Sequence, residues 1–258
     1  MASLMQNRGL RQSRAAFLAD ETQGMFDTGD IRGADALAAD APLTVRPDAQ
    51  RMWSITAGLT HEVALMAPGR HGALIFASGT KPGGGWRNGA IAQEEDVCMH
   101  GTWGLQAEHA GPGFYGDEAT AGLGPDAVLM AEGAWLIHPN QFALGGPVSV
   151  VFGAVAAPNR HHSAVRDLPS EALEEVLARR LRTAFDAWAD RDVPTVVAGA
   201  IGCGVFCWAG DASARALIRG LVHSRWGGRL ILAMPDPVLA ATFSKALTEA
   251  FGPATKLR

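Results

Sequence analysis

The chain has 258 residues, which is enough for one large α/β domain or two small ones with a well-buried core. Hydrophobic residues make up 48% of it and charged residues 19%, which excludes a disordered chain, and the net charge of −4 argues against broad electrostatic capture of nucleic acid. The 31 glycines indicate many tight loops, or places where the backbone approaches another group closely.

The three cysteines are an odd number and indicate free thiols in a reducing compartment. Cys203 and Cys207 are four residues apart, but no neighbouring His or Cys completes a zinc ligand set, so we expect no metal. No stretch reaches the roughly 20 apolar residues that a membrane span requires. The sequence therefore predicts a cytoplasmic protein without a membrane partner.

The first elements in chain order are a helix and two mixed segments. Apolar residues at roughly helical spacing predict an amphipathic helix from residue 11 to about residue 26. The segment 43–47 alternates like a strand, and 54–67 is typical of a strand end followed by a helix.

The next segment combines a strand, a loop and a helix. The short apolar run at 72–78 favours a strand buried on both faces of a mainly parallel sheet. A glycine-rich loop follows at 79–90, and the pattern at 91–105 is compatible with a helix. Loops at the carboxyl ends of such strands commonly bind ligands.

The middle of the chain predicts two strands and a long helix. The strands cover 128–138, with a turn at Glu132-Gly133, and 147–157. The helix covers 169–189, with Ser170 as its N-cap and acidic residues in its first turns.

The last third predicts strands alternating with helices: a strand running into a glycine loop at 195–206, a helix at 212–224, a strand at 229–236 and a helix at 237–251. This order implies parallel βαβ units in a three-layer α/β/α sandwich with a mixed, largely parallel sheet. We expect one domain over 1–258, with an N-terminal helical extension at 1–42 and a core at 43–258.

The first glycine loop contains Gly83, Gly84 and Gly85. Backbone N–H groups of such a loop, with the N-terminus of the next helix, suit an anion, although a plain tight turn is the alternative. Glu94 and Glu95 follow at the helix start, where they either complement the helix dipole or act on a ligand. One carboxyl could hold a sugar hydroxyl while the other transfers a proton.

The second glycine loop has Gly199, Gly202 and Gly204, followed by Phe206 and Trp208. Its amides suit a diphosphate and an aromatic ring could pack on a ribose or a base; a glycine-rich strand exit with core aromatics is the alternative. His100 lies near the glutamates and Cys203 lies in this loop, and we expect both to pack within the protein.

Three segments resemble the bacterial-type poly(ADP-ribose) glycohydrolases. Residues 81–95 (KPGGGWRNGAIAQEE) are similar to the family signature of three glycines, seven residues and Gln-Glu-Glu. Residues 199–206 are similar to its second loop, and 8–29 to its N-terminal helix. Where the family usually has Phe-Leu after the glycines, this chain has Trp86-Arg87.

The resemblance implies a macrodomain-like fold and a glycosidase. It implies that Glu95 is the catalytic acid, that Glu94 contacts the scissile ribose and that Gln93 supports that geometry. The residues it implies for binding ADP-ribose are Gly83, Gly84, Gly85, Asn88, Gly199, Ala200, Ile201, Gly202, Cys203, Gly204, Val205 and Phe206.

The implied activity is hydrolysis of the ribose–ribose O-glycosidic bond of poly(ADP-ribose), which releases ADP-ribose without a metal or cofactor. Removal of single ADP-ribose groups from protein, nucleic acid or a small molecule is the alternative reaction. A binding module that recognises ADP-ribose without turnover is the alternative from another class. The expected partner is ADP-ribose or its polymer, either free or attached to protein, and no direct nucleic-acid binding is expected.

Overall fold

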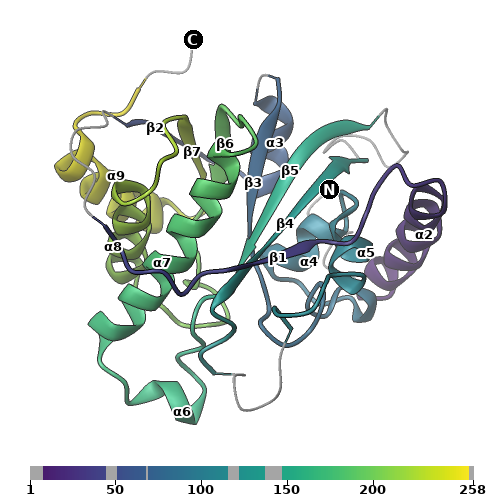
Figure 1. Cartoon of the computed structure of the whole chain (residues 1–258), viewed down its shortest axis with the longest axis horizontal. Helices are drawn as coiled ribbons and strands as arrows, with labels where there is room; N and C mark the ends of the chain where they lie inside the picture. The colour runs from purple at the N-terminus through teal and green to yellow at the C-terminus, as the bar shows by residue number, and fades with distance from the viewer. Residues whose placement is uncertain (1–7, 45–50, 68, 116–121, 137–146, 256–258) are drawn as a thin grey trace.

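The structure is a computed structural model that describes residues 8–44, 51–67, 69–115, 122–136 and 147–255 (Figure 1). In these ranges seven strands form one sheet in the order β1-β4-β5-β3-β6-β7-β2. All the pairs are parallel except those that β4 makes with β1 and β5. The strands are β1 (Asp35–Ala38), β2 (Met52–Thr56), β3 (His71–Phe76), β4 (Ala127–Trp135), β5 (Val148–Val155), β6 (Thr195–Ala198) and β7 (Arg229–Ala233).

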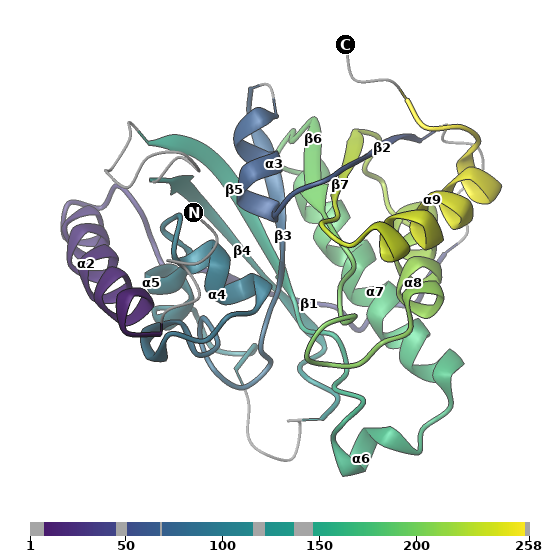
Figure 2. The same ribbon diagram turned by 180° about the vertical axis from the view of Figure 1, so that it is seen from behind.

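Helices cover both faces of this sheet, as Figures 1 and 2 show from opposite sides. One face carries α6 (Ser163–Arg166), α7 (Ser170–Ala189), α8 (Gly210–Val222) and α9 (Pro237–Phe251). The other carries α2 (Arg8–Asp27), α3 (Thr60–Met66), η1 (Trp86–Asn88), α4 (Gln93–Cys98) and α5 (Trp103–Glu108). The predicted three-layer α/β/α fold with a mixed, largely parallel sheet is confirmed.

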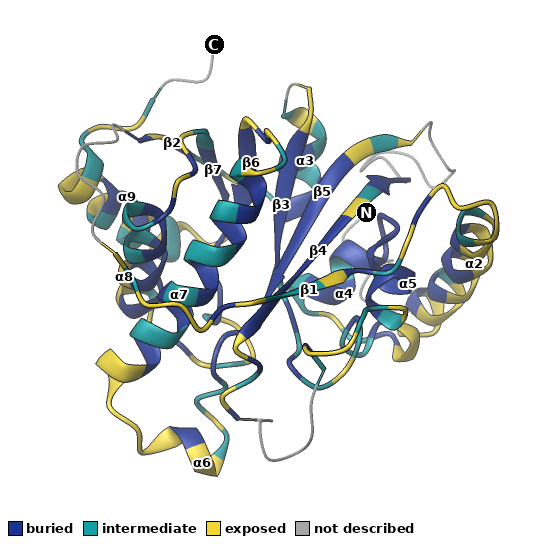
Figure 3. Cartoon of the chain, viewed as in Figure 1, coloured by how far each residue is buried: buried dark blue, intermediate teal, exposed yellow. Residues whose placement is uncertain are grey.

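Strand β3 shows why two hydrophobic cores form. Leu74 belongs to the core under α7 and α8, whereas Ala73 and Ile75 belong to the core under α3, α4 and α5. Successive side chains of a strand point to opposite faces, so a run buried on both faces must be apolar throughout. The central strands are accordingly dark blue in Figure 3, while the outer side of α2 is exposed.

Several predicted boundaries are correct. The helix expected at 237–251 is α9, whose N-cap Asp236 accepts hydrogen bonds from the amides of Val238 and Leu239 at 2.7 and 3.2 Å. The buried strand expected at 72–78 is β3, and the helix expected at 169–189 is α7. Pro169, however, is the N-cap of α7, and Ser170 is its first residue, whose hydroxyl accepts a hydrogen bond from Arg160.

Two predictions around β4 are wrong. The pattern at 91–105 is two short helices rather than one, because the segment between them bonds to the edge of β4: the amide of Thr102 donates to the carbonyl of Ala134 at 3.0 Å. The turn predicted at Glu132-Gly133 is regular strand, paired with Val151 and Val150. Gly133 is required by packing, since a Cβ there would lie 2.5 Å from Oε1 of Gln106.

The edges of the sheet also differ from the prediction. Residues 43 and 44 are not in a strand, and the rest of the strand predicted at 43–47 lies outside the described residues. Strand β4 ends at Trp135, and the end of the strand predicted at 128–138 also lies outside them. Strand β1, which was not predicted, pairs with β4, so the region 1–42 contributes an edge strand as well as a helix.

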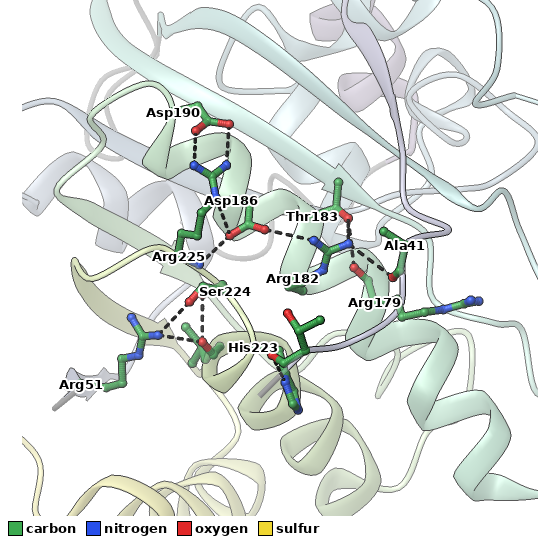
Figure 4. Close-up of polar contacts among 12 residues, drawn as sticks. Ala41, Arg51, Arg179, Arg182, Thr183, Asp186, Asp190, His223, Ser224 and Arg225 are labelled. Carbon is green, nitrogen blue, oxygen red and sulfur yellow. Dashed lines mark hydrogen bonds and ion pairs between the residues drawn. The ribbon is translucent and has the colours of Figure 1, made fainter. Parts of the chain in front are cut away.

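An arginine–aspartate network ties the ends of α7, α8 and β2 together (Figure 4). Asp186 accepts from the backbone amide of Arg225 at 2.6 Å and from Nη1 of Arg182 at 3.1 Å. Arg51 precedes β2 and donates to the carbonyls of Leu221 and Ser224, at the C-terminal end of α8. A cation at a helix C-terminus is stabilising, so the bonds of Arg51 help to hold the start of β2 against the end of α8.

Four parallel strands, β3, β6, β7 and β2, end at the same edge of the sheet. The two glycine loops follow β3 and β6, which are neighbours, and are therefore brought together at that edge. This is the position at which open α/β sheets bind ligands. Among the helices of the described ranges, none has both the length and the apolar character needed to cross a membrane.

Candidate active site

The first glycine loop has a conformation that other residues rarely adopt. Gly83 and Gly84 have φ angles of 64° and 62°, in the left-handed region. A Cβ on Gly83 would lie 2.7 Å from Cδ1 of Trp86, whose ring is buried beneath the loop. Trp86 and Arg87 both bond to Glu108, so these two departures from the family pattern support the loop from below.

Gln93 fixes the start of α4 against β3. Its Oε1 accepts from the amide of Phe76 at 2.8 Å, and its Nε2 donates to Oγ1 of Thr60 at 3.0 Å and to the carbonyl of Leu74 at 2.9 Å. These bonds use the side-chain amide at both ends. Gln93 therefore fixes the start of the helix that carries Glu94 and Glu95, and its supporting role in a reaction stays a prediction.

The Glu94 carboxyl group is buried beneath the first loop. Its Oε2 accepts from the amide of Ser78 at 2.7 Å, and its Oε1 from the indole of Trp103 at 3.3 Å. Burial raises the pKa of Glu94 to about 8, and the neighbouring Glu95 adds to this rise against the effect of the hydrogen bonds. Glu94 is therefore predominantly protonated at neutral pH.

The Glu95 carboxyl group contacts the loop itself. Its Oε1 accepts from the amide of Gly85 at 2.8 Å and its Oε2 from the amide of Ala92 at 3.1 Å. A Cβ on Gly84 would lie 2.4 Å from Oε1 of Glu95 and 3.3 Å from Oε2 of Glu94. The glycine therefore allows the backbone to lie directly against both carboxyl groups.

The second loop offers backbone donors. The amides of Gly204, Val205 and Phe206 donate to no acceptor within the described ranges, and Gly204 and Val205 are exposed. Gly202 has a φ of 82°, and a Cβ there would lie 2.7 Å from Cδ1 of Trp208. Unpaired amides in a glycine turn are the kind of donors that can bind an anion, and the binding role expected for this loop stays a prediction.

A cavity of about 510 Å³ lies beyond the ends of the four parallel strands, within the size range of small-molecule sites. Its walls come from the loops after β2, β6 and β7, from the start of α4 and from α2. The residues that line it are mainly apolar. They include Phe76, Ile91, Ala92, Gln93, Ala200, Cys203, Gly204, Met234 and Leu239, together with Arg11 and Asp96.

A cluster of His61, Asp96 and His100 adjoins this cavity at Asp96, with one potential metal-ligand atom from each residue within 4.8 Å of the others. Nδ1 of His61 bonds to Oδ2 of Asp96 at 2.6 Å, and Nδ1 of His100 to the carbonyl of Asp96 at 2.7 Å. The two rings are stacked 3.6 Å apart at 7°, so their in-plane lone pairs run parallel and do not converge on one ion. Burial, with His61, lowers the pKa of His100 to about 3, so this ring is neutral. Expected here as a packed residue, His100 holds α4 in place.

The structure brings most of the predicted site residues together at one edge of the sheet. Asn88 is not one of these residues: its side chain is exposed, and its backbone carbonyl accepts a hydrogen bond from Arg8 of α2. Arg11 and the loops after β2 and β7 also line the cavity and were not predicted from the sequence. The arginines at 8, 11 and 14, three residues apart on one helix, are the signal that could have indicated Arg11.

The raised pKa of Glu94 predicts a distinctive dependence of stability on pH. The unfolded carboxyl has a pKa near 4.5 and the folded one near 8, so between these values the folded state binds more protons. The free energy of unfolding therefore falls as pH rises from 5 to 8, by up to about 1.4 kcal/mol per pH unit from this group. We expect Glu94→Gln, which stays neutral, to lack that component.

Chemical unfolding of the wild type and of Glu94→Gln at intervals from pH 5 to pH 9 measures how the free energy of unfolding depends on pH. The variant should gain stability relative to the wild type as pH rises to 8, and the difference should level off above that. If the free energies of unfolding of the two proteins changed with pH in parallel over the whole range, the raised pKa of Glu94 would be refuted.

Comparisons with known proteins support the resemblance to the bacterial-type poly(ADP-ribose) glycohydrolases. The family model described as "Microbial-type PARG, catalytic domain" matches residues 38–115, which include the first loop and both glutamates. No curated protein matches the chain. The resemblance inferred from the Gln-Glu-Glu motif is thereby confirmed for this part of the sequence.

The fold is similar to that of solved bacterial poly(ADP-ribose) glycohydrolases. The enzyme from Thermomonospora curvata bound to the inhibitor ADP-HPD is 22% identical, with a TM-score of 0.71 over 92% of this chain and 99% of that one. The enzyme from Deinococcus radiodurans in complex with ADP-ribose is 24% identical, with a TM-score of 0.68 over 85% of this chain and 95% of that one.

Proposed function

We propose that this chain is a poly(ADP-ribose) glycohydrolase that hydrolyses the ribose–ribose O-glycosidic bond and releases ADP-ribose. The observation that carries the proposal is the contact between the first glycine loop and two buried carboxyl groups, one of which is protonated at neutral pH. The match of residues 38–115 to the catalytic-domain family supports it. So does the similar fold of enzymes whose structures hold ADP-ribose or ADP-HPD.

The positions of the groups suggest how the ligand would lie. The scissile ribose would rest on Gly84 and Gly85, beside Glu94 and Glu95. The diphosphate would accept hydrogen bonds from the free amides of residues 204–206, where Phe206 would pack on the ribose. The cavity is not lined by either glutamate, so the part of the ligand farthest from the scissile bond, the adenosine, would fill it.

In the proposed reaction, Glu95 protonates the leaving hydroxyl oxygen as the bond from that oxygen to the anomeric carbon breaks. The negative diphosphate nearby favours an oxocarbenium-like centre on the sugar. The Glu95 carboxylate then takes a proton from water as the water oxygen bonds to the anomeric carbon, which restores the acid. All these groups come from the chain and the substrate.

Glu94 would serve the same reaction by binding rather than by proton transfer to the leaving group. Its carboxyl group is neutral at pH 7, so it can donate a hydrogen bond to a ribose hydroxyl without repelling the diphosphate. It also adds no negative charge beside Glu95.

The alternative reaction is the removal of single ADP-ribose groups from protein, nucleic acid or a small molecule, and the alternative from another class is an ADP-ribose-binding module. Purified protein should be incubated with poly(ADP-ribose) and, separately, with mono-ADP-ribosylated protein, and free ADP-ribose should be followed. We expect release from the polymer. Release only from the mono-modified protein would favour the second reaction, and tight binding without release would indicate the binding module.

We further propose that the substrate is polymer attached to protein, and that the site of action is the cytoplasm, in keeping with three free cysteines. Direct binding of nucleic acid is not part of the proposal, since the net charge of −4 provides no general attraction for it.

A further inference from the structure

Asp96 places a carboxylate in the mainly apolar wall of the cavity. It lies on α4 three residues after Gln93, and both residues line the cavity, since residues three apart share a helix face. The side chain of Asp96 keeps 18% of its surface accessible, so a ligand can reach it. Asp236 also lines the cavity, but it is exposed and its Oδ1 caps α9. Asp96 is therefore the partly buried carboxylate of this wall.

The two oxygens of Asp96 are used differently. Oδ2 bonds to Nδ1 of His61 at 2.6 Å. Oδ1 lies 3.9 Å from Nδ1 of His100, which is too far for a hydrogen bond, and that nitrogen bonds instead to the backbone carbonyl of Asp96 at 2.7 Å. In the part of the chain that the structure describes, Oδ1 accepts no hydrogen bond, although each carboxylate oxygen can accept two. It is therefore available as an acceptor.

The charge of Asp96 limits which part of a ligand can lie beside it. Burial acts to raise the pKa of Asp96, but the hydrogen bond and charge of His61 outweigh burial and lower that pKa. The group is therefore ionised at neutral pH, so it accepts hydrogen bonds and donates none. It repels a diphosphate and attracts N–H and O–H donors. This wall consequently suits the uncharged, donor-bearing half of ADP-ribose, which is the adenosine.

We propose that Asp96 is a specificity-determining residue: its Oδ1 accepts a hydrogen bond from a donor of the adenosine, either the 6-amino group of the base or a hydroxyl of its ribose. The inference rests on the proposed function for the identity of the ligand. Adjacent helix residues point about 100° apart, so Glu95 can contact the first loop while Asp96 lines the cavity. The bond of Oδ2 to His61 orients the carboxylate before the ligand arrives.

The test is calorimetric titration of wild type, Asp96→Ala and Asp96→Asn with ADP and three analogues that each lack one donor. They are purine riboside diphosphate, which has hydrogen in place of the 6-amino group, 2′-deoxy-ADP and 3′-deoxy-ADP. Loss of a hydrogen bond to a charged group predicts that one analogue binds wild type about 10- to 100-fold more weakly than ADP. In Asp96→Ala that analogue and ADP should bind within about threefold of each other. Asp96→Asn keeps a neutral acceptor, so its ratio of affinities should be intermediate.

The ratio of affinities separates recognition from a structural effect, because loss of the partner of His61 would weaken all four nucleotides alike. Asp167→Asn is the control, since it removes an exposed carboxylate outside the cavity and should keep the wild-type ratios. The inference is overturned if no analogue binds wild type more weakly than ADP, or if Asp96→Ala keeps the wild-type ratios. Nucleotide binding does not depend on turnover. A selective effect of Asp96 in a protein that leaves poly(ADP-ribose) uncut would therefore refute the proposed function alone, and unselective binding in a protein that cuts it would refute this inference alone.

Discussion

Glu95→Gln is expected to abolish the release of ADP-ribose from poly(ADP-ribose) while keeping the affinity for ADP-ribose within a few-fold of wild type. The amide has nearly the same shape, and its oxygen can still accept from the amide of Gly85, which holds the loop. It has no proton to give to the leaving oxygen and cannot activate water. Loss of a general acid–base typically costs about 100- to 10,000-fold in rate.

Single-turnover kinetics and a direct binding measurement separate these two effects. Glu132→Gln is a suitable control, since Glu132 is an exposed residue of β4 that pairs with Arg70. Unchanged turnover in Glu95→Gln would remove Glu95 from the role of acid. Loss of turnover in Glu94→Gln with normal turnover in Glu95→Gln would reverse the roles of the two glutamates.

Gly84→Ala should be the most damaging conservative change in the first loop. The added methyl carbon would lie 2.4 Å from Oε1 of Glu95, and the backbone has a φ of 62° that alanine adopts at a cost. We expect the free energy of unfolding to fall by about 1–3 kcal/mol. Displacement of the loop from Glu95 should reduce kcat/KM by about 100-fold.

Gly24→Ala provides the comparison, because Gly24 lies in α2 and a Cβ there would meet nothing within 4 Å. This variant should keep full activity and gain slightly in stability, since alanine favours a helix. Thermal unfolding and steady-state kinetics of both variants give the two quantities. Normal activity in Gly84→Ala would mean that the carboxyl groups do not need the loop at this distance.

The elements predicted best from sequence are those whose local signals agree with their packing. In α9 the Asp236-Pro237 pair sets the start of an apolar helix, and in β3 an uninterrupted apolar run has only one suitable place, the centre of a parallel sheet. The short edge strand β1 has the sequence DALA, which carries little strand preference. Its pairing with β4 decides its conformation, and no local pattern reveals that.

Some features of the candidate site could likewise be predicted from the sequence, and others could not. The two glycine loops could be predicted because glycine spacing, a preceding buried strand and the Gln-Glu-Glu motif lie together in the sequence. The place of Arg11 in the wall of the cavity could not be predicted, since it depends on where α2 packs: Arg11 contacts Ala90, about 80 residues further along the chain. The protonation of Glu94 likewise follows from burial under the loop and against Trp103, which a sequence pattern does not contain.

The identity of the product shows most directly whether the bond cut is the glycosidic one between riboses. Purified wild-type protein should be incubated with poly(ADP-ribose), and the soluble products separated and identified by mass. We predict ADP-ribose as the product, formed by wild type and not by Glu95→Gln. Phosphoribosyl-AMP would instead show cleavage of the pyrophosphate, and intact polymer under conditions in which the protein binds ADP-ribose would show that the site recognises its ligand without cutting it. Either result would contradict hydrolysis of the ribose–ribose bond by this protein.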